Sequence, residues 1–467
     1  MQFEGFDPDS EEVRRVRWKV DKRLIPMLSL LYLCSYLDRV NLGNAKVANL
    51  EADLNLTSGL FNMAGSIFYI GYILGEIPAN LALKKVGPKI WLPLTMIGFG
   101  GMSMCTAAVT NGAGLLATRF FLGLAESGYA PTPVFIISLW YPRREHAFRA
   151  GIFFSTATVA GAFGGLVAYG ISQLQGLGGL RAWQWIFLLE GLFTVACCII
   201  VYLILPDFPE TSTFLSPAEK ELNIKRLKFD AGPASSTAFS WPEFWAAFKD
   251  WKVYAFIYVG LLHAVALTSL GLFVPSITRG FGYDPIATQL MTVPIYTVAC
   301  FCTLLCAYSS DRFTERGFHV AAPMFIAAVG YVLLIITRHS SLVLRYISLV
   351  ICTSGVYAAI PVLLAWKPSI IGGHAKRGTA IAFVMAAVQI GGIIGGQVYR
   401  NDDAPLYVRG NATCAGILFL DVFSLLGFKY ILYRENRRRD QLTPKEYEKE
   451  CQGSDATDMH PDFRYIH

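Results

Sequence analysis

The chain has 467 residues, of which 54% are apolar and only 16% are charged. Soluble domains average about 25% charged residues, and disorder requires low hydrophobicity, so the composition excludes both classes. The net charge of +6 is small and scattered, so we expect no nucleic-acid partner. The composition therefore favours an all-α membrane protein.

The cysteines and the N-terminal residues exclude two further features. Most of the ten cysteines lie inside apolar runs. Cys302 and Cys306 are one helical turn apart, but no histidine or carboxylate accompanies them, so we expect no metal and no cofactor. The first 23 residues are polar and basic without an apolar core, which excludes a cleavable signal peptide.

Apolar stretches predict the membrane-spanning helices, because a helix needs about 20 mostly apolar residues to cross the hydrocarbon core. A first group covers 24–45, 60–83, 90–109, 113–140, 148–172 and 185–205, and a second covers 253–277, 287–309, 318–337, 343–366, 378–399 and 413–433. We therefore predict twelve transmembrane helices in two six-helix halves. The expected units are a tail (1–23), a first half (24–205), a cytoplasmic linker (206–252), a second half (253–433) and a second tail (434–467).

The distribution of lysine and arginine predicts the orientation, because cytoplasmic loops are enriched in these residues. With both termini in the cytoplasm, 31 basic residues lie inside and seven lie outside. Two sequons, at Asn55 and Asn411, then lie outside and are possible glycosylation sites, although both are close to the membrane.

The second half repeats the first at an offset near 227 residues. Ser127-Gly128 matches Ser354-Gly355, and Trp140-Tyr-Pro142 matches Trp366-Lys-Pro368. Glycine runs follow in both halves, at 161–165 and 391–396, and small residues let membrane helices approach closely. Two repeated halves are typical of an alternating-access carrier with its site between them near the bilayer midplane.

Several motifs follow one another along the chain: Tyr36-Leu-Asp-Arg-Val-Asn41, Glu76-Ile-Pro78, Arg119 with Glu126-Ser-Gly128, and Arg434-Glu-Asn-Arg-Arg-Arg-Asp440. In this order they resemble the major facilitator superfamily, over roughly residues 15–445. The resemblance is greatest to anion:cation symporters of the fungal allantoate, nicotinate and pantothenate permease type. The resemblance implies a secondary transporter with functional roles for Asp38, Arg39, Arg119 and Glu126. One departure is Trp366-Lys-Pro-Ser369, where many relatives carry asparagines.

Four charged residues, Asp38, Arg39, Arg119 and Glu126, lie deep in predicted spans, where each costs about 3 kcal/mol or more. Arg119 and Glu126 are about 10 Å apart along one helix face, so each needs another partner. Two interpretations remain open. The four form a neutral latch between the first and fourth helices, or Asp38 and Glu126 carry protons while Arg39 and Arg119 bind an anion through their planar guanidinium groups.

Further candidates are weaker. Tyr36, Asn41 and Gln389 are expected to contact substrate, and Lys84, Asp311 and Arg312 are expected to act in gating at the cytoplasmic side.

The sequence therefore predicts a monomeric, proton-coupled transporter of a small organic anion in a fungal plasma membrane. Its partners are the anion, protons and the lipid bilayer. Two alternatives are an exporter of an acidic secondary metabolite and a non-transporting nutrient receptor. A channel is disfavoured because no filter-like loop is present, and an enzyme because no nucleophile–base or metal constellation is visible.

Overall fold

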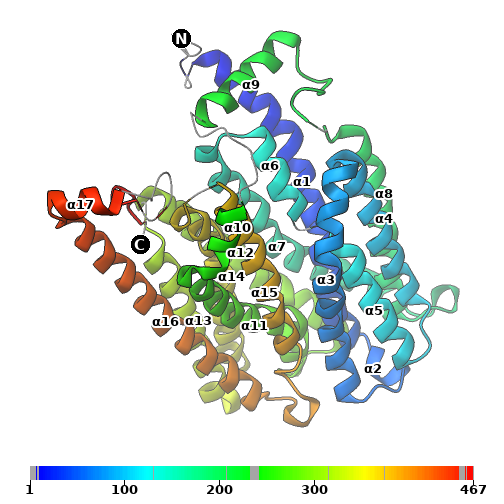
Figure 1. Cartoon of the computed structure of the whole chain (residues 1–467). Helices are drawn as coiled ribbons and strands as arrows, with labels where there is room; N and C mark the ends of the chain where they lie inside the picture. The colour runs from blue at the N-terminus through cyan, green and yellow to red at the C-terminus, as the bar shows by residue number, and fades with distance from the viewer. Residues whose placement is uncertain are drawn as a thin grey trace.

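The computed structural model describes residues 7, 10–129, 131–206, 208–231, 241–313, 315–372, 374–451, 458 and 460–465, and the regular elements in this part of the chain are helices (Figure 1). The first half contains α1 (Glu11–Val47), α2 (Leu50–Asp53), α3 (Ser58–Val86), α4 (Pro88–Ala107), α5 (Gly112–Glu126), α6 (Pro131–Trp140), α7 (Arg143–Ser172), η1 (Leu177–Gly179) and α8 (Ala182–Ile204). The linker contains α9 (Pro217–Ala231) and α10 (Trp241–Lys249). The second half and tail contain α11 (Trp251–Arg279), α12 (Pro285–Phe313), α13 (Gly317–Ile336), η3 (Thr337–His339), α14 (Leu342–Ile370), α15 (His374–Gly395), η4 (Asn401–Asp403), α16 (Val408–Asp440) and α17 (Pro444–Cys451).

Within the described residues, ten helices are long and apolar enough to cross a membrane. Two further crossings complete the predicted twelve-helix fold: α1, whose many charged residues lower its apolarity, and the pair α5–α6, each member of which is short. α1 begins 13 residues before the predicted span of 24–45. Ser10 caps this extension, since its hydroxyl accepts a hydrogen bond from the Val13 N–H at 3.4 Å.

The fourth crossing is interrupted, whereas the sequence predicts one helix over 113–140. α5 ends at Glu126 and α6 begins at Pro131. Pro131 has no backbone N–H, so the carbonyl four residues earlier loses its helical partner. The next carbonyl, that of Gly128, accepts a hydrogen bond from Trp91 Nε1 on α4 at 3.1 Å. The break therefore leaves Glu126 at a helix end inside the bundle.

We call the end of the bundle where α1 begins and α16 ends the terminal end. The two halves are joined at the opposite end. At the opposite end, Arg279 Nη1 donates to the Val47 carbonyl at 2.9 Å, and Asn62 Nδ2 donates to the Tyr399 carbonyl at 2.8 Å. Lys46 Nζ also donates to Asn401 Oδ1 at 2.8 Å. These bonds join the halves into one closed surface at that end.

The two glycine runs allow the halves to approach one another. A Cβ atom at Gly165 of α7 would lie 2.1 Å from Thr292 Oγ1 of α12. A Cβ atom at Gly392 of α15 would lie 2.5 Å from the ring of Tyr69 of α3. Each half therefore uses its glycine run to contact a helix of the other half.

At the terminal end, a cavity of about 470 Å³ separates α7 from α12 and α14. Its walls include Ser155, Thr303, Asp311, Arg312 and Pro361. The structure is thus closed between the halves at the opposite end and hollowed at the terminal end.

At the terminal end, ion pairs between charged side chains also join the helices within each half. In the first half, Arg149 Nε and Nη2 donate to the two carboxylate oxygens of Asp21, at 2.7 and 2.8 Å. In the second half, the tail residue Asp458 is fully buried and pairs with Lys252 and with Lys376, the latter at 2.7 Å. Asp250, the N-cap of α11, also pairs with Lys376 at 2.7 Å, so the second half combines a carboxylate from its own first helix with one from the tail.

Candidate functional site

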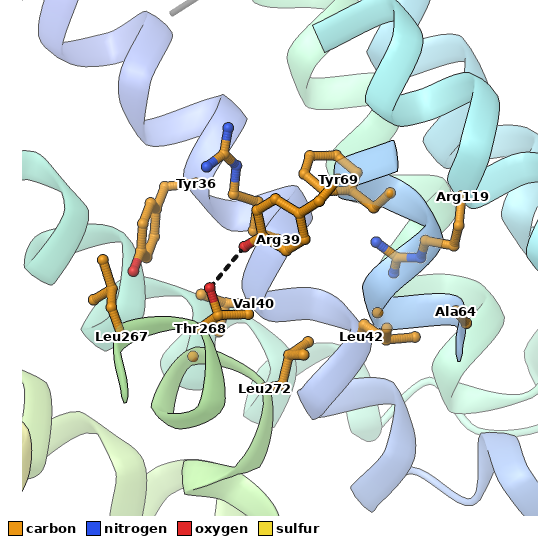
Figure 2. Close-up of a pocket in the computed structure, with 13 residues that line it drawn as sticks. Tyr36, Arg39, Val40, Leu42, Ala64, Tyr69, Arg119, Leu267, Thr268 and Leu272 are labelled. Atoms are coloured by element: carbon orange, nitrogen blue, oxygen red, sulfur yellow. Dashed lines mark hydrogen bonds between the residues drawn. The ribbon is translucent and has the colours of Figure 1, made fainter. Parts of the chain in front are cut away.

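A cavity of about 60 Å³ lies between the halves, beside the last third of α1 (Figure 2). Arg39 and Arg119 of the first half line it together with residues of α11. One hydrogen bond crosses it, between the hydroxyls of Tyr69 and Thr268 at 3.1 Å. The remaining walls are largely apolar and comprise Tyr36, Val40, Leu42, Ala64, Gly65, Phe68, Leu267, Gly271 and Leu272. The cavity thus offers cationic groups within an apolar surround.

Arg39 has an internal counter-ion, Glu126. Arg39 Nε and Nη2 donate to Glu126 Oε1 at 2.9 and 2.6 Å, and Ser35 Oγ donates to the same oxygen at 2.6 Å. The Glu126 side chain is fully buried, whereas that of Arg39 is 23% exposed. The guanidinium also lies over the rings of Phe68 and Tyr72, at 5.3 and 5.5 Å. Arg39 is therefore held by the first half and accessible from the cavity.

Asp38 and Arg119 form a second arrangement between α1 and α5. Arg119 Nη1 donates to the backbone carbonyl of Asp38 at 3.2 Å, and its guanidinium lies 5.2 Å from the ring centre of Phe187 on α8. Within the described residues, neither carboxylate oxygen of Asp38 accepts a hydrogen bond, and Nε and Nη2 of Arg119 donate none. These groups retain bonding capacity deep in the bundle.

The structure adds an acid that the sequence analysis overlooked, Glu190. It lies on α8, is 5% exposed, and its Oε2 accepts a hydrogen bond from Asn41 Nδ2. Asn41 therefore points towards α8, whereas we expected it at the substrate. The signal was available, because Glu190 is an acid inside the predicted span 185–205.

Tyr36 connects the halves. Its hydroxyl lies 2.8 Å from that of Tyr357 on α14, and the two rings are 6.5 Å apart in an edge-on arrangement. Tyr296 of α12 packs against Tyr357 with a ring distance of 5.7 Å. The cavity wall at Tyr36 is therefore continuous with an aromatic group of the second half.

The other predicted site residues lie away from this cavity. Gln389 is half-buried on α15, outside the cavity lining. Asp311 and Arg312 line the terminal cavity, where Asp311 pairs with Arg316 at 2.6 Å. Lys84 belongs to α3, but its side chain lies outside the described residues.

The two sequons differ in accessibility. Asn55 is exposed, whereas Asn411 is buried and both of its amide groups are bonded. Tyr399 donates to Asn411 Oδ1 at 2.8 Å, and Asn411 Nδ2 donates to the Leu406 carbonyl at 3.3 Å. The folded chain therefore leaves no room for a glycan at Asn411.

Comparison with known proteins identifies the family. The model of the Major Facilitator Superfamily matches residues 28–396. The chain belongs to the major facilitator superfamily. It is 35% identical to the MFS transporter prlL of a fungal species, over 92% of this chain and 88% of that protein. It is 29% identical to the high-affinity nicotinic acid transporter of Saccharomyces cerevisiae, over 98% of this chain and 86% of that protein.

Solved structures agree with this assignment. The chain is similar to the xylose transporter XylE of E. coli in a partially occluded inward open conformation, with a TM-score of 0.69. That similarity covers 88% of this chain and 98% of XylE at 13% sequence identity, so it concerns the fold alone. As a major facilitator protein, the chain is a multi-pass membrane transporter and not an enzyme. No group of three potential metal ligands occurs within its described residues.

Proposed function

We propose that this superfamily member imports a small organic anion together with protons across a fungal plasma membrane, as a monomer and by alternating access. The observation that carries the proposal is the Arg39–Glu126 ion pair at the cavity between the halves. An anionic substrate needs a cation at the site, and a proton-coupled carrier needs an acid that competes for the same cation.

The ion pair suggests how substrate and proton are coupled. Both bonds from Arg39 end on one oxygen, Glu126 Oε1, which is at the end of α5. A substrate carboxylate that enters the cavity would compete with Glu126 for the guanidinium. Once displaced from Arg39, the buried Glu126 would take up a proton, because an unpaired carboxylate is costly in the membrane. Substrate and proton would then cross together without net charge on this pair.

The charge distribution supports an orientation with both termini in the cytoplasm. In that orientation the joined end of the bundle faces outward, and the 470 Å³ cavity opens to the cytoplasm. Asp311 and Arg312 at its mouth are then suited to gating at the cytoplasmic side. Tags at the two ends of the chain should both resist protease in sealed cells, and an exposed C-terminus would contradict this topology.

The cavity favours an acid that is less polar than allantoate. Val40, Leu42 and Leu272 supply apolar walls. On α14, the hydroxyl of Ser369 is bonded to the Trp366 carbonyl at 2.6 Å, and the Pro368 side chain lies outside the described residues. A site with few polar partners discriminates little against apolar groups. The nicotinic acid transporter among the relatives supports a carboxylate as the substrate class.

Glu126→Gln tests the mechanism in proteoliposomes with radiolabelled allantoate, nicotinate and pantothenate. Gln mimics a permanently protonated Glu, so this variant should exchange substrate across the membrane but fail to accumulate it in response to a pH gradient. Asp421→Asn removes a buried acid of the second half and is the matched control, which should accumulate substrate normally.

The latch interpretation predicts a different result. Glu126→Gln would then lower stability and expression, and the folded fraction would still accumulate substrate. Efflux from the cytoplasmic side alone would favour the exporter, and binding of a carboxylate without any flux would favour the receptor. Normalising each rate to folded protein separates these outcomes.

A further inference from the structure

Glu190 belongs to the same buried charge cluster as the proposed transport site. The cluster consists of three acids and two arginines from α1, α5 and α8: Asp38, Glu126, Glu190, Arg39 and Arg119. Asn41, which donates to Glu190, lies one turn from Asp38 on the same face of α1, so the two acids are neighbours. Arg119 lies over the ring of Phe187, which is about one helical turn from Glu190 on α8.

The charges of this cluster do not balance. If all five groups were ionised, three negative charges would face two positive ones and leave one uncompensated charge inside the membrane. Such a charge is expensive, so one of the acids must hold a proton. Glu126 already receives two hydrogen bonds from Arg39 and is the acid with a complete counter-ion. Arg119, whose charged neighbours are Asp38 and Glu126, is the other cation of the cluster and is left to offset the charge of Asp38 and Glu190 together.

We propose that Asp38 and Glu190 share one proton, which makes Glu190 a third acid of the proton path. When one of the two acids is ionised next to Arg119, the other is neutral. Two close carboxyls that share one cation titrate as a pair. Asn41 holds Glu190 in place through Oε2, and within the described residues its Oε1 has no hydrogen-bond partner.

Asp38 is the charged neighbour of Glu190, and Arg119 lies over Phe187, one turn from Glu190 on α8. α8 packs against α1, α4 and α7. The charged residues of α4 and α7 lie near the terminal end, where α4 carries Lys89 and α7 begins with Arg143. The uncharged groups near the cluster are the thiol of Cys34, which interacts with Asp38 and Cys197, and the hydroxyl of Ser103 on α4.

The second half provides a matched comparison. The stretch Ile186-Phe-Leu-Leu-Glu190 on α8 resembles Ile417-Leu-Phe-Leu-Asp421 on α16, the last helix of the other half. Asp421 is fully buried, and within the described residues it forms no ion pair and neither carboxylate oxygen has a hydrogen-bond partner. Asp421 has neither a cation nor a second acid beside it within the described residues, so it should hold its own proton and share it with no other group.

Infrared spectroscopy of the purified protein at pH 7 tests the shared proton without a substrate, because protonated carboxyls and carboxylates absorb separately. Glu190→Gln and Asp38→Asn should each remove the same signal, equal to one protonated carboxyl, because the remaining acid then ionises beside Arg119. Asp421→Asn should remove a different carboxyl signal. A loss in only one of the first two variants, or in neither, overturns the proposal.

The conservative variant Glu190→Asp guards against a folding defect. It keeps a carboxyl at a changed distance from Asp38 and Arg119, so the shared signal should persist at a shifted frequency. A spectrum identical to that of the parent overturns the proposal.

The role of Glu190 in transport rests on the proposed proton coupling. Glu190→Gln should retain nicotinate exchange and lose nicotinate accumulation, whereas Glu190→Asp should accumulate nicotinate with a shifted pH dependence. Retained accumulation in Glu190→Gln contradicts the inference alone. If the parent accumulates no acid of the panel, the proposed function fails, and the infrared comparison still decides whether the proton is shared.

Discussion

Corresponding positions in the two halves carry different chemistry. Glu126 of α5 corresponds by the repeat to Thr353 of α14, and both are fully buried. Glu190 has a hydrogen-bonded partner and ionic neighbours, whereas Asp421 is isolated within the described residues. At these two positions the first half therefore carries acids with polar or charged partners, and the second half contributes hydroxyls such as those of Thr268 and Tyr357 to the contact between the halves.

This asymmetry suits a carrier whose halves move relative to one another. The Arg39–Glu126 pair and the contact of Arg119 with Asp38 lie within one half. Rocking of the halves therefore need not separate opposite charges inside the membrane, which would be costly. Of the bonds that must break between the halves, the Tyr36–Tyr357 and Tyr69–Thr268 contacts at the cavity are neutral, and each costs little. The bonds at the joined end come from Arg279, Lys46 and Asn62 and end on uncharged acceptors.

The largest effect on binding is expected from Arg39→Lys. Lysine keeps the charge but loses the planar fork, so about 1.5–3 kcal/mol of charged hydrogen bonding is lost and binding weakens about 10- to 100-fold. Thermal-shift titration with the same three carboxylates measures this loss. Arg345→Lys is the control from the second half, where the repeat counterpart of Arg119 lies over Phe281, and it should bind as the parent does. Equal affinity in Arg39→Lys would place the substrate carboxylate elsewhere.

The next effect concerns stability at the terminal end. Asp458→Asn leaves Lys252 and Lys376 with an incomplete counter-ion in a buried place and should destabilise the protein by about 3 kcal/mol. The control, Asp21→Asn, removes a carboxylate that is 33% exposed, and should cost about 1 kcal/mol. Thermal unfolding of the detergent-solubilised protein measures both. A larger loss for Asp21→Asn would reverse the comparison.

The ion pairs of Asp458 with Lys252 and Lys376 also make the stability of the protein depend on pH. Burial alone would raise the pKa of Asp458, but Lys252 and Lys376 outweigh it and hold this pKa below its usual value. A carboxyl with a lowered pKa in the folded state stabilises the protein above its unfolded pKa of about 3.9 and loses that contribution as the pH falls. The stability difference between the parent and Asp458→Asn should therefore be constant near neutrality and shrink only below about pH 4.

A smaller effect is expected at the contact between the halves. Tyr36→Phe and Tyr357→Phe each remove the same neutral hydrogen bond, worth about 1 kcal/mol, and should change the nicotinate exchange rate about fivefold. Because both variants lose one shared bond, the double variant should behave like either single one. Additive effects in exchange assays would indicate separate roles for the two hydroxyls.

The smallest effect separates the two sequons. Asn55→Gln should abolish any enzymatically removable glycan on protein expressed in a fungal host, because Asn55 is exposed. Asn411→Gln should leave the gel mobility unchanged, since Asn411 is bonded inside the bundle. Neither should alter transport. A glycan that persists in Asn55→Gln and disappears in Asn411→Gln would contradict the folded arrangement of that region.

Much of the fold could be predicted from apolar runs, because a bilayer demands long apolar helices. The interruption of the fourth helix was missed although Pro131 is visible in the sequence, since membrane helices often tolerate proline and only the surrounding contacts decide. Here Trp91 of α4 donates a hydrogen bond to the Gly128 carbonyl, which the break leaves without its helical partner, and this lowers the cost of the break.

The sequence by itself determined the membrane-spanning helices, the repeat, and which charges would need partners, because burial of a charge is costly wherever the helices pack. Only the tertiary structure decided which residues those partners are. It paired Arg39 with Glu126, turned Asn41 towards Glu190, and buried Asn411. Helical periodicity specifies the direction of a side chain around its own helix, whereas the neighbour that it meets depends on how all the helices pack together.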